Sequence, residues 1–476
     1  MTSYLNEYYR CPGRYARFGV TGEPSKASGY FRFGEHTLYG RYCGQEPARI
    51  PVGKLTDASL ETSVHNGTTY LPFDIGQVVD EIRRERYAED AGDGNSRLSA
   101  LKPFYYFLRP FLPIVVRKHL QQLHLKGWQQ IPFPHWPVDT TIDTLFEQLL
   151  LLSLKSSGVN RIPFIWFWPE GAPAGAMMTH DVETDGGRDF CPALMDIDDS
   201  YGISSSFQIV PEQRYEVPAA FREAIVRRGF RIGVQDLNHD GYLYRSKEQF
   251  LARAARINKY GREWGADGFR AGVLYRKQDW FDALDFAYDM SVPNVAHLDP
   301  QRGGCCTVMP YFVGKILELP VTTVQDYTLF HILNEYSINL WERQIDLIMA
   351  KHGLMSFIVH PDYVTGVRER GVYESLLGYL VQLRSENGVW IATPDEVNHW
   401  WRQRAEMEIV EENGSLRIHG PGSERAHMAY ASEEDGRIVF TMEPPLPATM
   451  IWHRRLRDAT HWHSSLTAVP VRQRTD

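Results

Sequence analysis

The chain has 476 residues, which is more than one ordinary hydrophobic core needs and predicts two or three domains. Apolar residues make up 43% of it and aromatic residues 13%, which excludes wholesale disorder. The formal net charge of -8 argues against a nucleic-acid-binding protein, because phosphate binding needs a basic surface.

Cysteine usage indicates the redox environment. The five cysteines are an odd number and contain no Cys-x-x-Cys pair, which fits a reduced compartment better than a disulfide framework. The adjacent pair in the sequence RGGCCTVMP is expected to be two buried loop thiols rather than metal ligands. The cysteines are Cys11, Cys43, Cys191, Cys305 and Cys306.

The first twenty residues carry charges and Pro12 where a signal peptide would have an apolar stretch. No stretch reaches the roughly 18 uninterrupted apolar residues that a membrane span needs. The nearest approach, Phe104–Val116, is interrupted by Arg109, Pro110 and Pro113, and we expect it to be a buried aromatic segment. These features predict a cytoplasmic protein without a membrane span.

Residues 1–165 predict an accessory α+β domain. They contain strand-like pieces such as Tyr30–Tyr42 and helical patterns at Val79–Arg86 and Ile142–Lys155, but no motif of known chemistry. The aromatic connector Ile162–Gly171 must be buried somewhere. We therefore expect this region to cover part of the next domain and to shape its mouth.

Residues 172–404 alternate short apolar strands with amphipathic helices, which predicts an α/β fold with a parallel sheet or a barrel. Ser246 and Gln249 form a capping box at the start of one helix, and Thr393 with Pro394 begins another. The expected strands include Ala176–Thr179, Arg231–Gln235, Leu354–Val359 and Val389–Ala392, and the expected helices include 218–229, Ile338–His352 and one through Trp400.

Residues 405–476 change to an alternating pattern, which predicts a small antiparallel β appendage. Two strands are expected around a turn at Asn413-Gly414, and a third strand is expected after Asp435-Gly436. The tail from Thr467 is expected to be loose.

Four predicted strands end in residues that can do chemistry. These ends are Thr179–Glu183, Gln235–His239, Gly268–Arg270 and Ile358–Asp362. In an α/β barrel the reactive groups lie at the carboxyl ends of the strands, so four such ends would meet at one mouth. That convergence is what a hydrolytic metal site requires.

The order of these strand ends resembles the polysaccharide deacetylase family, also called NodB-like or carbohydrate esterase family 4. Its motifs follow the same sequence: an aspartate pair, a His-x-x-x-His pair, an arginine motif and a late histidine. The stretch Gly268–Asn294 adds an arginine strand followed by a helix and a Tyr-Asp-x-Ser turn. The resemblance covers about half of the chain and implies a distorted, incompletely closed seven-stranded (β/α) barrel.

The resemblance implies a role for each matching catalytic residue. Asp181 would be the general base, and Arg270 would orient it, with Asp289 as the carboxylate partner of Arg270. His360 would protonate the leaving amine.

The implied metal site departs from the family pattern. Glu183 takes one ligand position and His239 matches the second histidine, but the first histidine falls on Gln235. A neutral amide oxygen is a poorer zinc ligand than an imidazole nitrogen. Gln235, Asp236 or His180 would have to complete the site. The implied cofactor is a divalent metal, zinc first, with cobalt or manganese as alternatives.

The implied function is metal-dependent removal of an acetyl group from an N-acetylated sugar of a polysaccharide or its precursor. A bound ion lowers the pKa of water from 15.7 toward about 7, a carboxylate takes its proton, and a histidine returns one to the amine. Two alternatives remain open. The barrel could have lost catalysis and bind a glycan or support an assembly complex, or it could hydrolyse a small cyclic amide.

Overall fold

The computed structural model describes residues 4–90, 125 and 127–443. The segment Phe104–Val116 and the tail from Thr467, for which the sequence gives expectations, lie outside the described residues. Within the described part of the chain, no helix combines the length and the apolar character that a membrane crossing requires.

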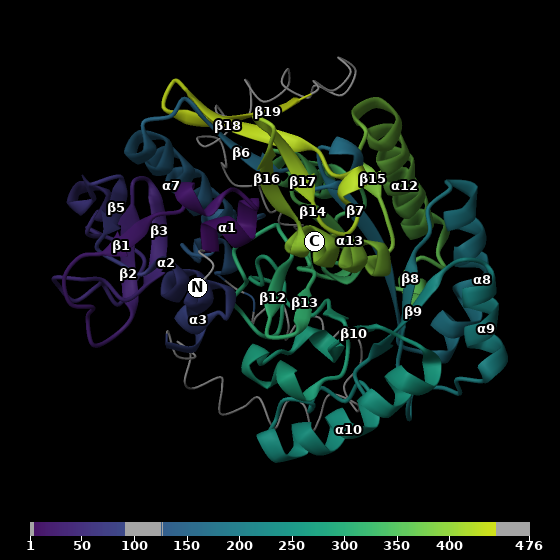
Figure 1. Cartoon of the computed structure of the whole chain (residues 1–476). Helices are drawn as coiled ribbons and strands as arrows, with labels where there is room; N and C mark the ends of the chain where they lie inside the picture. Colours follow the sequence, from purple (N-terminus) through teal and green to yellow (C-terminus); the bar gives the residue numbers. More distant parts are fainter. Residues whose placement is uncertain (1–3, 91–124, 126, 444–476) are drawn as a thin grey trace, which may run out of the picture.

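A curved, mostly parallel sheet forms the centre of the α/β region (Figure 1). In the described residues it has nine strands in the order β12-β13-β11-β10-β9-β8-β7-β14, with β15 paired to the beginning of β7. Strand β12 runs antiparallel to β13. The bounds are β7 Gly175–Val182, β8 Ser206–Ile209, β9 Arg231–Gln235, β10 Gly268–Arg270, β11 Tyr288–Asp289, β12 Tyr311–Val313, β13 Ile316–Glu318, β14 Leu354–Ile358 and β15 Trp390–Ile391.

Side chains, rather than strand pairing, bridge the two ends of this sheet. Thr322 and Thr323 follow β13 and donate hydrogen bonds from Oγ1 to carbonyl oxygens of β14, each at 2.7 Å. The sheet is therefore curled like a barrel but does not close by backbone pairing among the described strands. The expected α/β barrel type is found, whereas the expected count of seven strands is not established by this sheet.

Several helices lie along the outside of the curved sheet (Figure 1). Ser246 caps α10 by accepting a hydrogen bond from the Gln249 backbone, and Thr393 with Glu396 forms a capping box at α13, with Pro394 as the first residue. The bounds are α8 Asp185–Ser200, α9 Ala219–Arg227, α10 Lys247–Trp264, α11 Asn339–Met349, α12 Val367–Asn387 and α13 Pro394–Glu406.

The first strand of the sheet is longer than the sequence predicted. We expected it to end at Thr179, but β7 continues to Val182 and all of its residues are buried. Parallel strands buried on both faces are usually apolar throughout, and the polar residues at the end of β7 obscured that pattern. Asp181 therefore lies within the strand, and the rigid sheet fixes its position.

The N-terminal region contains the predicted hairpin and helices with one correction. The hairpin of β2 (Gly29–Phe33) and β3 (His36–Gly40) confirms Tyr30–Tyr42, and α7 (Thr141–Ser157) confirms the second helix. The pattern Val79–Arg86 is instead divided between α2 and α3, because Glu85 has a left-handed backbone with a φ of 61°. The remaining bounds are α1 Tyr4–Tyr9, α2 Ile75–Arg83, α3 Arg86–Asp90, β1 Phe18–Val20, β4 Ser63–His65, β5 Thr68–Leu71 and β6 Arg161–Ile165.

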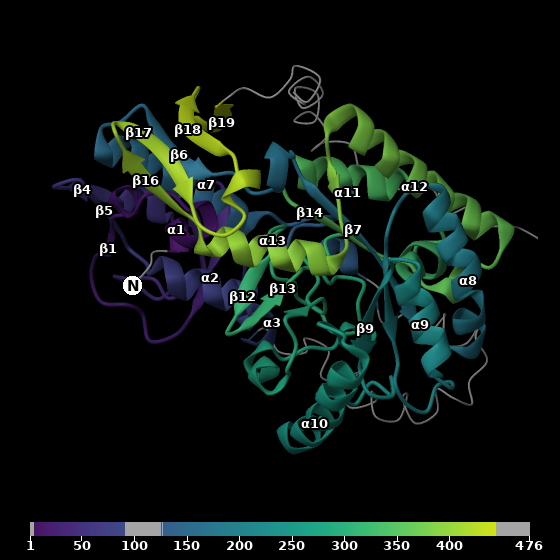
Figure 2. The same cartoon turned by 45° about the vertical axis from the view of Figure 1, so that its right-hand side comes forward.

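The C-terminal region forms two hairpins, and both lie beside N-terminal elements (Figure 2). The turns at Asn413-Gly414 and Asp435-Gly436 are as predicted. Strand β18, which the sequence did not suggest, pairs with both β19 and β6, so the last strand of the N-terminal region and the C-terminal region share one sheet. The bounds are β16 Glu408–Glu412, β17 Ser415–His419, β18 Met428–Glu434 and β19 Arg437–Glu443.

One hydrophobic core joins these regions to the barrel. The aromatic connector is buried as expected: Trp166, Phe167 and Trp168 are each 2% exposed or less. They belong to a cluster that also contains Trp400 of α13 and Leu354 of β14. The Trp400 indole donates a hydrogen bond to the Phe167 carbonyl at 2.9 Å.

A buried carboxylate also ties α7 to the barrel. Asp143 accepts hydrogen bonds from the hydroxyls of Tyr8 and Thr307 at 2.9 and 2.7 Å, and from the Val308 backbone at 3.1 Å. Burial raises its pKa to about 6, while these three donors oppose the rise. Since Tyr8 belongs to α1 and Val308 precedes β12, the carboxylate connects three separate parts of the fold.

We predict that Asp143→Asn lowers the free energy of unfolding by about 1–3 kcal/mol, because its amide group would face one of three donors and leave it unsatisfied. The control is Glu147→Gln on the same helix, whose partly exposed ion pair with Lys351 contributes about 0–1 kcal/mol. Chemical denaturation of both variants measures the difference. Equal midpoints for the two variants would contradict the prediction.

Candidate active site

The predicted residues at the ends of β7, β9, β10 and β14 come together. Asp181 lies near the end of β7 and Arg270 ends β10, and their side chains form an ion pair of 3.0 Å between Oδ1 and Nη1. Gln235 ends β9 and donates a hydrogen bond of 3.1 Å from Nε2 to the other oxygen of Asp181. Both carboxylate oxygens are thus held in place by neighbouring strands.

The protonation of Asp181 reflects two opposing effects. Its side chain is buried, which raises the pKa of the carboxyl above its usual value, while Arg270 and His360 oppose this rise. A carboxylate with a raised pKa is a better proton acceptor than a fully hydrated one. The environment therefore suits Asp181 to take a proton.

Glu183 is surrounded by hydrogen-bond donors and imidazoles. Its Oε1 lies 2.8 Å from His239 Nε2, 3.6 Å from His360 Nε2 and 3.1 Å from Gln235 Nε2, which donates to it. Burial alone would raise the pKa of Glu183, but His239 and His360 hold it well below its usual value. The same contacts raise the pKa of His239, against the effect of its burial.

His360 has a carboxylate partner that the sequence analysis missed. Asp326 accepts hydrogen bonds from His360 Nδ1 at 2.6 Å and from its backbone N–H at 2.7 Å. Although burial opposes it, Asp326 together with Glu183 raises the pKa of His360 well above its usual value. Asp326 begins a short helical segment after β13, where no strand-end pattern marks it.

These donors fit a divalent metal ion. Asp181, Glu183 and His360 each offer one ligand atom, and the three atoms lie within 4.8 Å of one another. His239 adds a second imidazole beside Glu183. Carboxylate oxygens and imidazole nitrogens are common ligands of zinc and similar ions. Gln235 turns its Nε2 toward these carboxylates, while its Oε1 is buried without a hydrogen-bond donor.

The expectation that His180 could complete the metal site is wrong. Side chains alternate along a strand, so His180 faces the opposite side of β7 from Asp181. Its ring nitrogens lie 3.0 Å from the Val359 carbonyl and 2.9 Å from the Asp198 carboxylate, deep between the sheet and α8. Asp198 also accepts a hydrogen bond from the Tyr373 hydroxyl. The sequence analysis did not identify Asp198 or Tyr373 as partners of His180.

Asp236 and Asp289 lie near the site and accept hydrogen bonds from residues that follow them closely in the chain. Asp236 accepts a hydrogen bond from the Leu237 backbone through Oδ1, and its Oδ2 is buried without a donor. Asp289, at the end of β11, accepts hydrogen bonds from the backbone and hydroxyl of Ser291. Burial raises the pKa of Asp289 to about 6, and Glu318 lies beside it. Arg270 hydrogen-bonds Asp181, and its charge also acts on Asp289, where it opposes the rise in pKa caused by burial.

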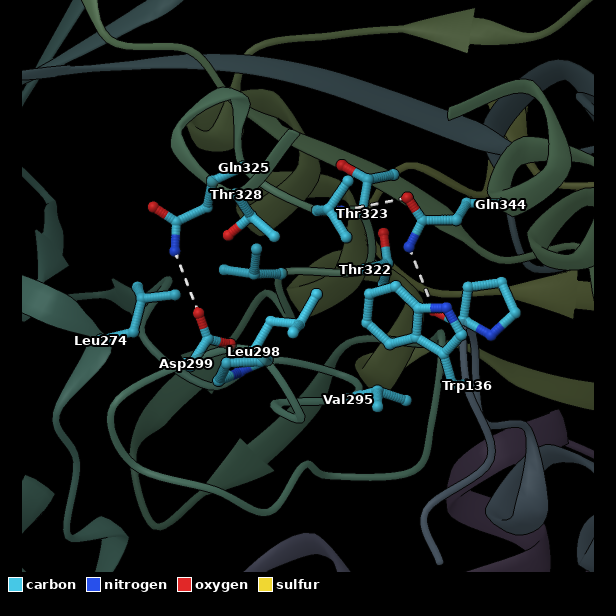
Figure 3. Close-up of a pocket in the computed structure, with 14 residues that line it drawn as sticks. Trp136, Leu274, Val295, Leu298, Asp299, Thr322, Thr323, Gln325, Thr328 and Gln344 are labelled. Atoms are coloured by element: carbon cyan, nitrogen blue, oxygen red, sulfur yellow. Dashed lines mark hydrogen bonds between the residues drawn. The ribbon is translucent and has the colours of Figure 1, made fainter. Parts of the chain in front are cut away.

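A pocket is lined by Gln325 and Thr328, which lie on either side of Asp326 in the chain (Figure 3). Gln325 and Leu274 face it on one side and Trp136 on the other. Trp136 comes from the N-terminal region, and Gln344 of α11 donates a hydrogen bond to the Pro137 carbonyl at 3.0 Å. The N-terminal region therefore contacts the loops at the mouth of the barrel, as the sequence led us to expect.

Fold and site together describe a curved, barrel-like α/β sheet with an acidic and histidine-containing centre at its strand ends. No family model matches the chain, and no curated protein matches it either. Solved structures do match, and they include polysaccharide deacetylases and related proteins of carbohydrate esterase family 4, the family that the motif order resembles.

Three of these structures illustrate the likeness. A proposed polysaccharide deacetylase from Mycobacterium smegmatis is 16% identical, with a TM-score of 0.40 over 50% of this chain and 93% of that one. The peptidoglycan deacetylase PdaC from Bacillus subtilis is 10% identical, with 0.33 over 50% and 95%. A family 4 pseudoenzyme from Bacillus anthracis is 12% identical, with 0.29 over 47% and 65%. Because these values are low, the function proposed below rests on the residues of this chain.

The contact between Asp326 and His360 gives a prediction for histidine titration. In Asp326→Asn the imidazolium loses its carboxylate partner, so the pKa of His360 should fall and the NMR titration midpoint should move to lower pH. Asp196→Asn is the control, since Asp196 forms its described ion pair with Arg228 at the surface and has no described contact with His360. An unchanged midpoint in Asp326→Asn would show that Asp326 does not set this pKa.

Proposed function

We propose that this chain is a metal-dependent hydrolase that removes an acetyl group from an N-acetylated sugar of a polysaccharide or its precursor. The observation that supports this most directly is the grouping of Asp181, Glu183, His239 and His360 at the strand ends. In that grouping Asp181, the candidate proton acceptor, and His360, the candidate proton donor, both lie close to the Glu183 carboxylate. Amide hydrolysis needs this combination of proton acceptor and proton donor.

Asp181 is the proposed general base. Arg270 and Gln235 fix its two oxygens, so the carboxylate has one orientation toward the site. Its raised pKa favours removal of a proton from a nucleophilic water molecule. Arg270 acts as a positioning residue here, because it touches the base and not the reacting atoms.

His360 is the proposed general acid. Asp326 accepts the hydrogen bond from Nδ1, which leaves Nε2 directed toward Glu183 and the site. Asp326 and Glu183 raise its pKa well above the usual value, which favours the doubly protonated ring. His360 can therefore donate the Nε2 proton to the departing amine while Asp326 stabilises the imidazolium.

Glu183 and His239 are the proposed metal-holding residues, with Gln235 as the third. A bound divalent ion, zinc before cobalt or manganese, supplies a Lewis acid that lowers the pKa of water and polarises the substrate carbonyl. Gln235 donates its amide hydrogens to Asp181 and Glu183, which partly offsets their negative charge. Rotation of this amide would turn Oε1 toward the ion in place of the N–H group.

Acetate release from N-acetylglucosamine oligomers, with zinc, cobalt or manganese added, tests this proposal. We expect release that a chelator abolishes and a divalent metal restores. Asp181→Asn should lower the rate by about 10²–10⁴, the usual contribution of a general base. The control Asp196→Asn alters an exposed ion pair with Arg228 and should leave the rate unchanged. Equal rates in Asp181→Asn and the unchanged chain would remove Asp181 from this role.

A second test concerns Gln235. Gln235→His adds an imidazole beside Glu183 and His239 and should raise the affinity for zinc measured by calorimetry, because nitrogen is a better zinc ligand than an amide oxygen. Asn238→His, a less buried position in the segment that carries His239, is the control and should change the affinity little.

The outcomes of the metal titration separate the possible roles of the barrel. Tight zinc binding by the unchanged chain would show that Gln235 does not weaken the site. No binding of zinc, cobalt or manganese by either form would contradict a metal-dependent hydrolase.

A further inference from the structure

We infer that Glu85, from the N-terminal region, is a positioning residue of the candidate active site. It holds a strained loop, residues 271–275, which packs against His239 and Asp236. The inference depends on the proposed function only through the role given to His239.

Glu85 and Arg276 form a buried ion pair between the N-terminal region and the barrel. Arg276 Nε donates to Glu85 Oε2 at 2.7 Å, and Nη2 donates to the other oxygen. The side chain of Arg276 is 1% exposed and that of Glu85 is 6% exposed. Glu85 Oε1 also accepts a hydrogen bond from the Gly304 backbone at 2.6 Å. A buried ion pair with two parallel bonds fixes the orientation of both groups.

Arg276 also hydrogen-bonds the loop that follows Arg270 and so restrains its backbone. Its Nη1 donates a hydrogen bond to the Leu274 carbonyl at 2.9 Å, and Gln301 hydrogen-bonds the Arg276 backbone on both sides. Val273 and Leu274 have left-handed backbones, with φ of 61° and 52°. A β-branched residue avoids this conformation, so the surrounding contacts must hold it.

The strained loop packs directly against the candidate site. A Cβ atom added at Gly272 would lie 2.7 Å from Asp236 Oδ2 and 3.0 Å from His239 Cδ2. The backbone at Gly272 therefore limits where the His239 ring can lie. His239 itself has a left-handed backbone, φ 53°, so its loop also depends on neighbouring contacts. The contacts run from Glu85 through Arg276 and the loop to His239.

The structure offers a matched control at the same interface. Arg84 and Arg86, on either side of Glu85, form ion pairs with Asp279. These pairs join the same two parts of the chain, but Asp279 is 42% exposed and lies beyond the strained loop. Asp279→Asn thus weakens the interface without touching the path from Glu85 to His239.

Amide hydrogen exchange of the full chain tests the inference without requiring activity. Glu85→Gln should speed exchange in residues 271–276 and 236–241, whereas Asp279→Asn should leave both segments unchanged. If Glu85→Gln does not fold, Glu85→Gln with Arg276→Gln removes the unpaired buried charge and should show the same faster exchange. Unchanged exchange in 236–241 in a folded variant would overturn the inference.

Cobalt binding by visible absorption gives the second readout. Residues that orient a ligand usually change metal affinity by about 10–100-fold, so Glu85→Gln should weaken cobalt binding by that factor and Asp279→Asn by less than about twofold. Unchanged cobalt affinity in a folded Glu85→Gln would also overturn the inference. If the unchanged chain binds no cobalt, the proposed function fails, while hydrogen exchange still decides the role of Glu85.

Discussion

The structure depends on keeping negative charge buried at the end of one strand. Asp181 and Glu183 are two residues apart, so both carboxylates point to the inner face of the sheet, where an unpaired charge would be costly. Arg270, His239 and His360 supply the compensating groups, each from a different strand end. The order of the strands is what brings these groups together, because the parallel sheet places all of its carboxyl ends at one edge.

The sequence predicted the α/β type, most helix limits and the meeting of Asp181, Glu183, Arg270, His239 and His360, because strand ends and caps are local signals. It did not predict Asp326, which begins a short helical segment and lies 34 residues before His360. The His180 hypothesis failed because alternation on a strand assigns adjacent residues to opposite faces. The sequence also did not predict the pairing of β18 with β6, because local patterns do not indicate which distant strand will be the partner.

Gln235 shows how one position can determine the charge balance of the site. Its amide group donates to both carboxylates without adding a full positive charge, whereas a metal ion would neutralise them more strongly. Gln235 Nε2 therefore lies between the two carboxylates and donates to both of them. Metal affinity and stability are therefore linked at this residue, and a substitution there changes both.

The sheet shared by β6, β18 and β19 also has a consequence for folding. Arg161 and Glu443 form an ion pair although 282 residues separate them, so this sheet is completed only after nearly the whole described chain has been synthesised. Until then β6 presents an unpaired strand edge and the aromatic connector lacks part of its cover. Contacts between such distant residues slow folding and favour association of incomplete chains, so a chaperone acting during synthesis should improve the yield.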